Sequence, residues 1–100
     1  MLKISIIEAR KERRLVLDGS LIAPWTAELM SACDRARTDL DGRELVVNLA
    51  DVAVISKEGE AALIALMNEG IKIRCRGVFT KLLVRQLARR ARTDTKETKQ

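Results

Sequence analysis

Apolar residues recur along this chain with two periods, and each period predicts a different kind of element. Alternating apolar and polar positions predict strands over residues 2–9, 14–18 and 71–76. Residues 45–49 are apolar on both sides apart from one position, which is typical of a central strand covered on each face. A second apolar run, residues 50–55, leads from it to the next helix. We therefore expect four main strands.

Helical spacing of about 3.6 residues accounts for the rest of the apolar pattern. The first helix is expected to have Pro24 in its first turn, to carry its apolar stripe from Trp25 to Leu40, and to end at a strong turn signal, Asp-Gly. The second is expected to begin at Ser56 and to stop at Gly70. The third should span residues 79–91 and pack through five residues: Phe79, Leu82, Leu83, Leu87 and Ala91.

The order of these elements predicts the fold class. After an N-terminal hairpin, strands and helices alternate, which favours parallel pairing with right-handed crossovers. We expect an α/β fold: a single domain with a mixed sheet of about four strands, flanked by three helices. Residues 1–92 should form this domain. Residues 93–100 contain no apolar side chain and are expected to form a disordered basic and polar tail.

Charge is unevenly distributed over the 100 residues, whose net charge is +5. Residues 1–70 carry 9 basic and 12 acidic side chains, and residues 71–100 carry 10 basic and 2 acidic ones. The last helix should therefore present a basic surface made of Lys81, Arg85, Arg89, Arg90 and Arg92. Such a surface is usually only solvated, and its alternative is binding of an acidic partner or nucleic acid. Nucleic-acid binding is disfavoured, because no exposed aromatic residue is available for base stacking.

The side-chain inventory argues against several other classes of function. Histidine and tyrosine are absent, which removes the usual acid–base catalyst near neutral pH and most histidine-based metal sites. Cys33 and Cys75 are too far apart in the sequence to suggest a metal-binding pair or a disulfide framework. We therefore expect both to be small core residues, and we expect the protein to be in a reducing cytoplasm. The N-terminus is too short and polar for a signal sequence, and no segment is apolar enough to enter a membrane. We expect no enzyme activity, cofactor or metal.

Three sequence segments resemble the STAS domain, a family named for sulphate transporters and anti-sigma factor antagonists. They are Leu15-Val16-Leu17-Asp18-Gly19-Ser20-Leu21, Leu45-Val46-Val47-Asn48-Leu49-Ala50-Asp51-Val52, and Ile55-Ser56-Lys57-Glu58-Gly59 before an aliphatic helix. The resemblance implies a non-catalytic, protein-binding module of the bacterial cytoplasm. In partner-switching systems of this family, a kinase phosphorylates the turn before the second helix, and the phosphate repels the binding partner.

The chain departs from the family at that turn. Ser56 stands where the family has Asp, Lys57 replaces the phosphorylated Ser or Thr, and Glu58 stands where Ser is frequent, so only Gly59 matches. Lysine accepts no phosphate in such a switch, so we expect binding that is not controlled by phosphorylation at this position. Ser56 itself has two interpretations, a helix N-cap and a phosphorylation site displaced by one residue. Gly59 is expected to allow close approach of another backbone, either from within the chain or from a partner.

The predicted partner-binding surface combines this turn with a loop and a strand residue. It contains Ser56, Lys57, Glu58, Gly59, Asn48, Gly19, Ser20 and Leu21. By resemblance, its partner is an anti-sigma factor kinase or a related regulator. The alternative is that the chain is a regulatory subunit of a membrane transport ATPase complex. The sequence leaves the oligomeric state open.

Overall fold

The computed structural model describes the backbone of residues 1–99 and the side chains of residues 1–77 and 80–91. Four strands and three helices follow one another in this part of the chain. They are β1 (Leu2–Glu8), β2 (Glu12–Leu21), α1 (Trp25–Ala36), β3 (Glu44–Ile55), α2 (Lys57–Asn68), β4 (Lys72–Arg74) and α3 (Val78–Lys99).

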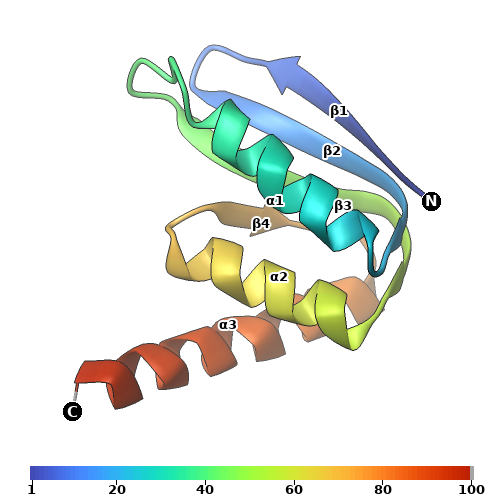
Figure 1. Ribbon diagram of the computed structural model, residues 1–100, viewed down its shortest axis with the longest axis vertical. Coiled ribbons are helices and arrows are strands. Elements are labelled where there is room, and N and C mark those ends of the chain that lie inside the picture. The colour runs from blue at the N-terminus through green and yellow to red at the C-terminus, as the bar shows by residue number, and fades with distance from the viewer. Residues whose placement is uncertain (100) are drawn as a thin grey trace.

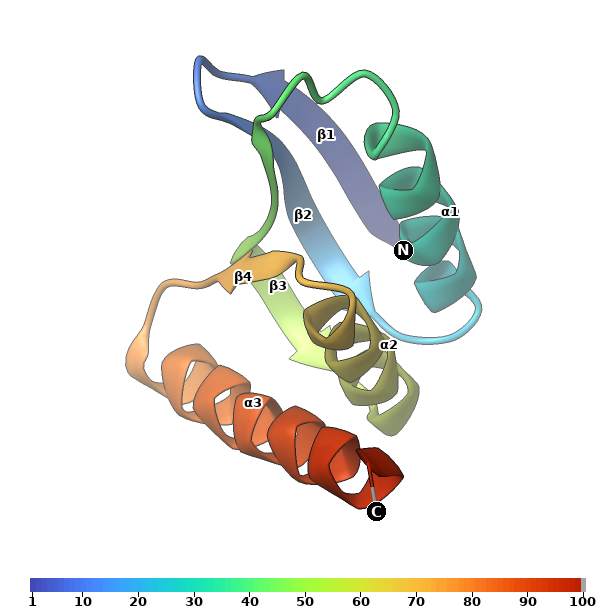
Figure 2. The same cartoon turned by 90° about the vertical axis from the view of Figure 1, so that its left-hand side faces the viewer.

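The four strands form one sheet in the order β1-β2-β3-β4. β1 and β2 are antiparallel, while β2 with β3 and β3 with β4 are parallel. The predicted mixed sheet with an N-terminal hairpin is therefore confirmed. The helices lie side by side, with α1 near β2, α2 near β3, and α3 packed along α2 (Figures 1 and 2). No helix in the described residues is long and apolar enough to cross a membrane.

The core lies between the two central strands and the helices. Leu15 and Leu17 of β2 and Val47 of β3 have no exposed surface, and Leu49 is 1% exposed. Each buried aliphatic side chain of this size contributes about 1.5–3 kcal/mol. The helices meet these strands with a set of buried residues: Leu29, Ala32, Cys33 and Ala36 of α1, Leu63 and Leu66 of α2, and Leu87 and Ala91 of α3.

On the other face of the central strand, a buried valine lies between charged residues of the neighbouring strands. Val46 is fully buried although it lies outside the main core cluster, and it pairs across the sheet with Arg14 and Lys72. Nearby, the Glu12 carboxylate forms ion pairs with the guanidinium groups of Arg14, at 2.8 Å, and of Arg74, at 3.0 Å. Val46 is thus buried on this second face in a row of long charged residues, whose side chains have aliphatic stems able to shield it from water.

Two strands extend further than predicted. Gly19, Ser20 and Leu21 were expected to form a loop, but they are the last three residues of β2. Gly19 has a φ of +115°, yet it still pairs with its neighbours, so the glycine marks a shift in register rather than a strand end. β3 likewise continues without interruption to Ile55, because the Asn48 side chain accepts the Ala50 N–H at 2.8 Å and bridges an irregular step.

Two other elements are shorter than predicted. α1 ends at Ala36, so Leu40 lies outside the helix, because Asp39 already has a φ of 60°. β4 contains only three residues, although the apolar alternation covers six.

The last helix is longer than predicted. It continues past Ala91 to Lys99, through a segment expected to be disordered. This segment contains no glycine or proline to stop the helix.

Two apolar residues that were expected to pack are exposed. Ile6 of β1 is 55% exposed and Leu82 of α3 is 51% exposed. Ile6 lies on the apolar side of an edge strand, where no helix lies directly above it. The remaining prediction for α3 is confirmed for Leu87 and Ala91, which are buried, and for Leu83, which packs on the core. The side chain of Phe79 lies outside the described part.

Cys33 should be chemically silent in the folded protein. It has no exposed surface, and burial raises the pKa of its thiol to about 11. Two pKa units lower the thiolate fraction roughly 100-fold at neutral pH. We expect a thiol reagent at pH 8 to modify the partly exposed Cys75 quickly and Cys33 only after denaturation. Cys75→Ser should leave no fast-reacting thiol, and a fast thiol in that variant would contradict the placement of Cys33.

Candidate functional site

The ends of β2 and β3 meet the start of α2 at one carbonyl group. Leu21 O accepts the backbone N–H of Ser56 at 3.1 Å, and the Ser56 Oγ lies 3.4 Å from the same oxygen. The pairing of Leu21 with Ile55 and of Ser20 with Val54 brings the two strands to this point together. The strand ends therefore hold the first residue before α2 through the backbone.

Ser56 caps α2, as predicted. Its backbone is extended, with φ −82° and ψ 177°, and its Oγ accepts the Gly59 N–H at 3.1 Å. The first helical bond runs from the Glu60 N–H to the Ser56 carbonyl at 2.8 Å. An N-cap of this kind stabilises a protein by about 1 kcal/mol. The chain direction of α2 is thus fixed at the point where it leaves the sheet.

Gly59 is required by the close approach of α2 to β2, which confirms the predicted backbone contact. A Cβ atom at this position would lie 2.3 Å from Leu21 O and 3.1 Å from the side chains of Ile55 and Leu21. The nearest obstacle is backbone that is already hydrogen-bonded to Ser56, so it cannot move without breaking the junction.

Lys57 and Glu58 form the exposed first turn of α2. Hydrogen bonds from the backbone N–H of Glu58 and from the Ser56 side chain, together with the charge of Lys57, hold the pKa of the Glu58 carboxyl below its usual value. The Ser56 hydroxyl therefore has two acceptors within reach, the Leu21 carbonyl and this carboxylate. The turn presents one positive and one negative charge to solvent on a rigid helix start.

The other predicted site residues are only partly brought to this turn. Gly19 and Ser20 are half-buried at the end of β2, next to the junction. Leu21 is at the junction, but its side chain is fully buried, so it contributes its backbone and not an accessible side chain. Asn48 does not join the group: it pairs with Val16, roughly 16 Å before the end of β2 along the strand.

Two features of the site were not predicted. Val54, two residues before Ser56, is 51% exposed and adds an apolar element beside the charged turn. Its neighbour Ala53 is exposed as well. The second feature is an ion pair between Glu60 in the first turn of α2 and Arg90 of α3, at 3.3 Å. The exposure of Val54 could have been predicted from the strand pattern only if it had been known that β4 stops pairing with β3 at Asn48.

The basic residues of α3 lie mainly on the side away from α2. Lys81, Arg85 and Arg89 are exposed and follow one another at intervals of four residues, while the buried Leu87 and Ala91 lie on the opposite side of the helix. Arg90 instead pairs with Glu60. The side chain of Arg92 lies outside the described part. Among the described residues, no three His, Cys, Asp or Glu side chains group closely enough to hold a metal ion.

The sequence matches no protein-family model and no curated protein. Its backbone is similar to a solved structure described as an antisigma-factor antagonist, STAS domain, from Rhodobacter sphaeroides, with a TM-score of 0.50 and 15% identity. The likeness covers 76% of this chain and 86% of that chain. At this identity the comparison establishes the fold, and the chain has the STAS-like fold that its sequence segments predicted.

Replacing Gly59 with alanine should destabilise the protein, although alanine favours helices. The propensity gain is about 1 kcal/mol, but the added Cβ would overlap Leu21 O, and overpacking of this kind costs about 1–3 kcal/mol. The net effect of Gly59→Ala should be a fall in the free energy of unfolding, measured by urea denaturation, of up to about 2 kcal/mol. Ala61→Gly, at an exposed α2 position, is the matched control for propensity alone. Increased stability of Gly59→Ala would contradict the close contact.

Proposed function

We propose that this chain is a non-catalytic regulatory module that binds a protein partner through the start of α2. The observation that carries this proposal is the exposed turn Lys57-Glu58, held rigidly because its cap, Ser56, is bonded to the end of β2. Charged groups on a fixed scaffold, beside the exposed Val54, suit recognition of a protein surface that has both an acidic and an apolar element.

The resemblance to STAS domains suggests the class of partner. An anti-sigma factor kinase or a related regulator is the partner we propose, and the two free cysteines fit a reducing cytoplasm. A transporter ATPase is the alternative, because the resemblance implies that STAS-type domains also serve as subunits of transport complexes. Both partners would use the same turn, so the identity of the bound protein decides between them.

Binding at this turn should be constitutive rather than switched. Lys57 occupies the position of the family's phosphate acceptor and carries a positive charge that no kinase removes. Ser56 is half-buried, and its Oγ accepts the Gly59 N–H and lies 3.4 Å from Leu21 O. A phosphoryl group there would bring its negative oxygens toward that carbonyl oxygen. We therefore propose that Ser56 acts as a cap and not as a phosphorylation site.

Charge reversal at Lys57 should weaken partner binding. We expect tagged Lys57→Glu chain to retain the partner from a lysate of the native host roughly tenfold less than the unmodified chain, a loss of about 1.4 kcal/mol. Lys11→Glu is the matched control, because Lys11 is also exposed but lies in the β1–β2 turn at the other end of the sheet. Circular dichroism of both variants should match that of the unmodified chain.

Two results of this experiment would contradict the proposal. Equal loss for Lys11→Glu and Lys57→Glu would show that general charge and not the α2 turn controls binding. A phosphoryl group on Ser56, found by mass spectrometry of the captured complex, would contradict constitutive binding. It would show instead a phosphorylation site displaced by one residue from the family's position. Mass spectrometry also identifies the partner as a kinase, another regulator or a transporter ATPase.

Nucleic-acid binding is a second candidate because Lys81, Arg85 and Arg89 form a solvent-facing basic stripe on α3. Three phosphate contacts would make affinity fall roughly 20-fold between about 50 and 150 mM salt. We expect a gel shift with duplex DNA to be weak at low salt and absent at the higher one. Lys81→Glu/Arg85→Glu should abolish the low-salt shift. A shift that persists at the higher salt would favour nucleic acid over a protein partner.

A further inference from the structure

β1 is an edge strand whose outer backbone is available for pairing. The Ala9 N–H and the Met1 carbonyl point toward β2, since they bond to Glu12 and Ser20. Backbone direction alternates along a strand, so the N–H and C=O groups of Leu2, Ile4, Ile6 and Glu8 point away from the sheet. Seven residues without proline are long for an exposed edge, and Ile6 is 55% exposed there.

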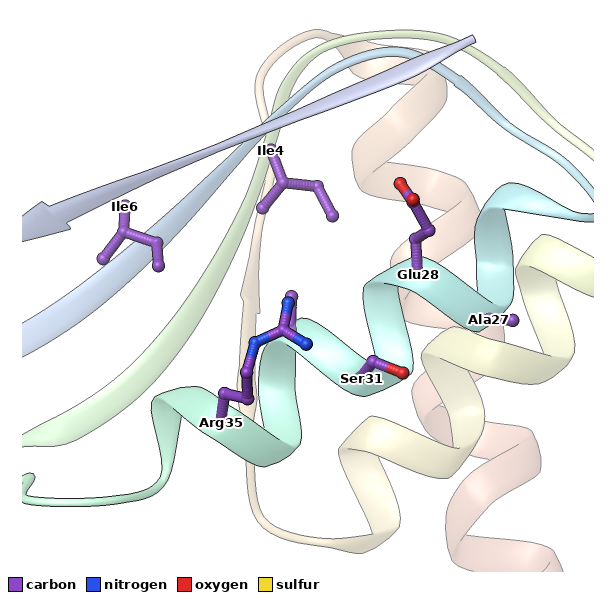
Figure 3. A pocket seen from close by; sticks show the side chains of 7 residues that line it. Ile4, Ile6, Ala27, Glu28, Ser31 and Arg35 are labelled. Atoms are coloured by element: carbon purple, nitrogen blue, oxygen red, sulfur yellow. The ribbon is translucent and has the colours of Figure 1, made fainter.

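An open groove of about 500 Å³ runs beside this edge, between β1 and α1. Figure 3 shows Ile4 and Ile6 extending from β1 toward α1, and Glu28 and Arg35 extending from α1 toward the strand. The α1 wall between these two charges contains the small residues Ser31 and Ala32, and Ala27 lines the groove beyond Glu28. Neither Glu28 nor Arg35 has an ion-pair partner among the described residues.

We propose that this face binds a second copy of the chain, with the two β1 strands paired antiparallel about a two-fold axis at Ser5. This register pairs Ile4 with Ile6 of the second copy and Leu2 with its Glu8, and these are the residues whose backbone groups point outward. It uses the whole length of β1 and joins the two sheets into one. The exposed Ile6 then packs beside Ile4 of the other copy.

The same axis also makes the two α1 helices complementary. An antiparallel arrangement about a point between Ser31 and Ala32 places Glu28 opposite Arg35 of the second copy, and Arg35 opposite its Glu28. The centre of β1 and the centre of this α1 segment lie beside the same groove. Ile4 and Ile6, on either side of Ser5, line it together with Glu28 and Arg35, on either side of Ser31 and Ala32. One two-fold axis therefore satisfies the strand edge and the helix charges together.

The spacing of a continuous sheet leaves room for this arrangement. Neighbouring strands lie about 4.8 Å apart, so β2 and its copy would be separated by roughly 14 Å. The α1 helices above them would lie too far apart for direct backbone packing, but within reach of Glu and Arg side chains. Ile4 and Ile6 of both copies would fill the floor of the joined grooves.

Self-association is favoured over capture of an unrelated extended segment by the pair of opposite charges. Any strand could satisfy the outer backbone groups of β1. A second copy, in addition, offers a positive group to Glu28 and a negative group to Arg35 at positions fixed by the strand register. The charge of Glu8 does not oppose pairing, because Arg13 and Arg43 hold its carboxylate at 2.9 and 2.8 Å.

Sedimentation equilibrium of the full chain tests this proposal over roughly 1–100 µM, the range in which weak dimers dissociate. We expect a mass approaching twice 11.2 kDa at the upper end. Ile6→Lys should keep the chain monomeric, because it places a charge in the centre of the edge. Val54→Lys is the matched control: this strand valine is 51% exposed but lies on β3, away from β1, so the variant should still dimerise.

A charge swap tests the register itself. Glu28→Arg and Arg35→Glu should each weaken the dimer at least tenfold, since each places like charges opposite one another twice. The double variant Glu28→Arg/Arg35→Glu should restore it. A monomeric wild type at the highest concentration, a dimer unaffected by Ile6→Lys, or failure of the double variant to recover would each overturn the proposal. Monomeric wild type that binds an extended peptide at β1 would assign the edge to another partner.

Discussion

The carbonyl group of Leu21 is the point on which the arrangement of the sheet end depends. It accepts the Ser56 N–H, and it blocks any side chain at Gly59. Strand pairing holds the ends of β2 and β3 together, and this backbone oxygen fixes the start of α2 against them. Because the helix start is held from behind by backbone, its outward side chains, Lys57 and Glu58, can vary without loss of the fold.

The charge at the start of α2 has a cost that folding alone does not explain. A cation in the first turn opposes the helix dipole by about 0.3–1 kcal/mol. Glu58 and Glu60 offset this locally, and Glu60 is also bonded to Arg90 of α3. A neutral residue at position 57 would avoid the cost altogether. The arrangement is understandable if Lys57 meets an acidic group on another molecule, which adds to the support for the proposed binding at this turn.

The sequence was sufficient to predict what local chemistry decides. The order of elements, the mixed sheet, the Ser56 cap and the close backbone contact at Gly59 all follow from period, capping and steric rules, and all are found. Two features depend on distant parts of the chain and could not be predicted locally. Gly19 continues a strand because Leu2 and Val52 pair with it, and Val54 is exposed because β4 is short. The bond from the Ala50 N–H to Asn48 is local, but the irregular step that it bridges is a shift in the pairing of β3 with β2.

The exposure of Ile6 has the same origin, and it connects the two surfaces of the molecule. Apolar alternation shows which side of β1 is meant to be covered, but not whether a helix is available to cover it. With α1 over β2, α2 over β3, and α3 packed along α2, none remains for β1 (Figure 2). A second copy would supply the missing cover. Because antiparallel pairing of β1 reverses the strand direction, the two α2 turns would then lie at opposite ends of the joined sheet, each free to bind its own partner.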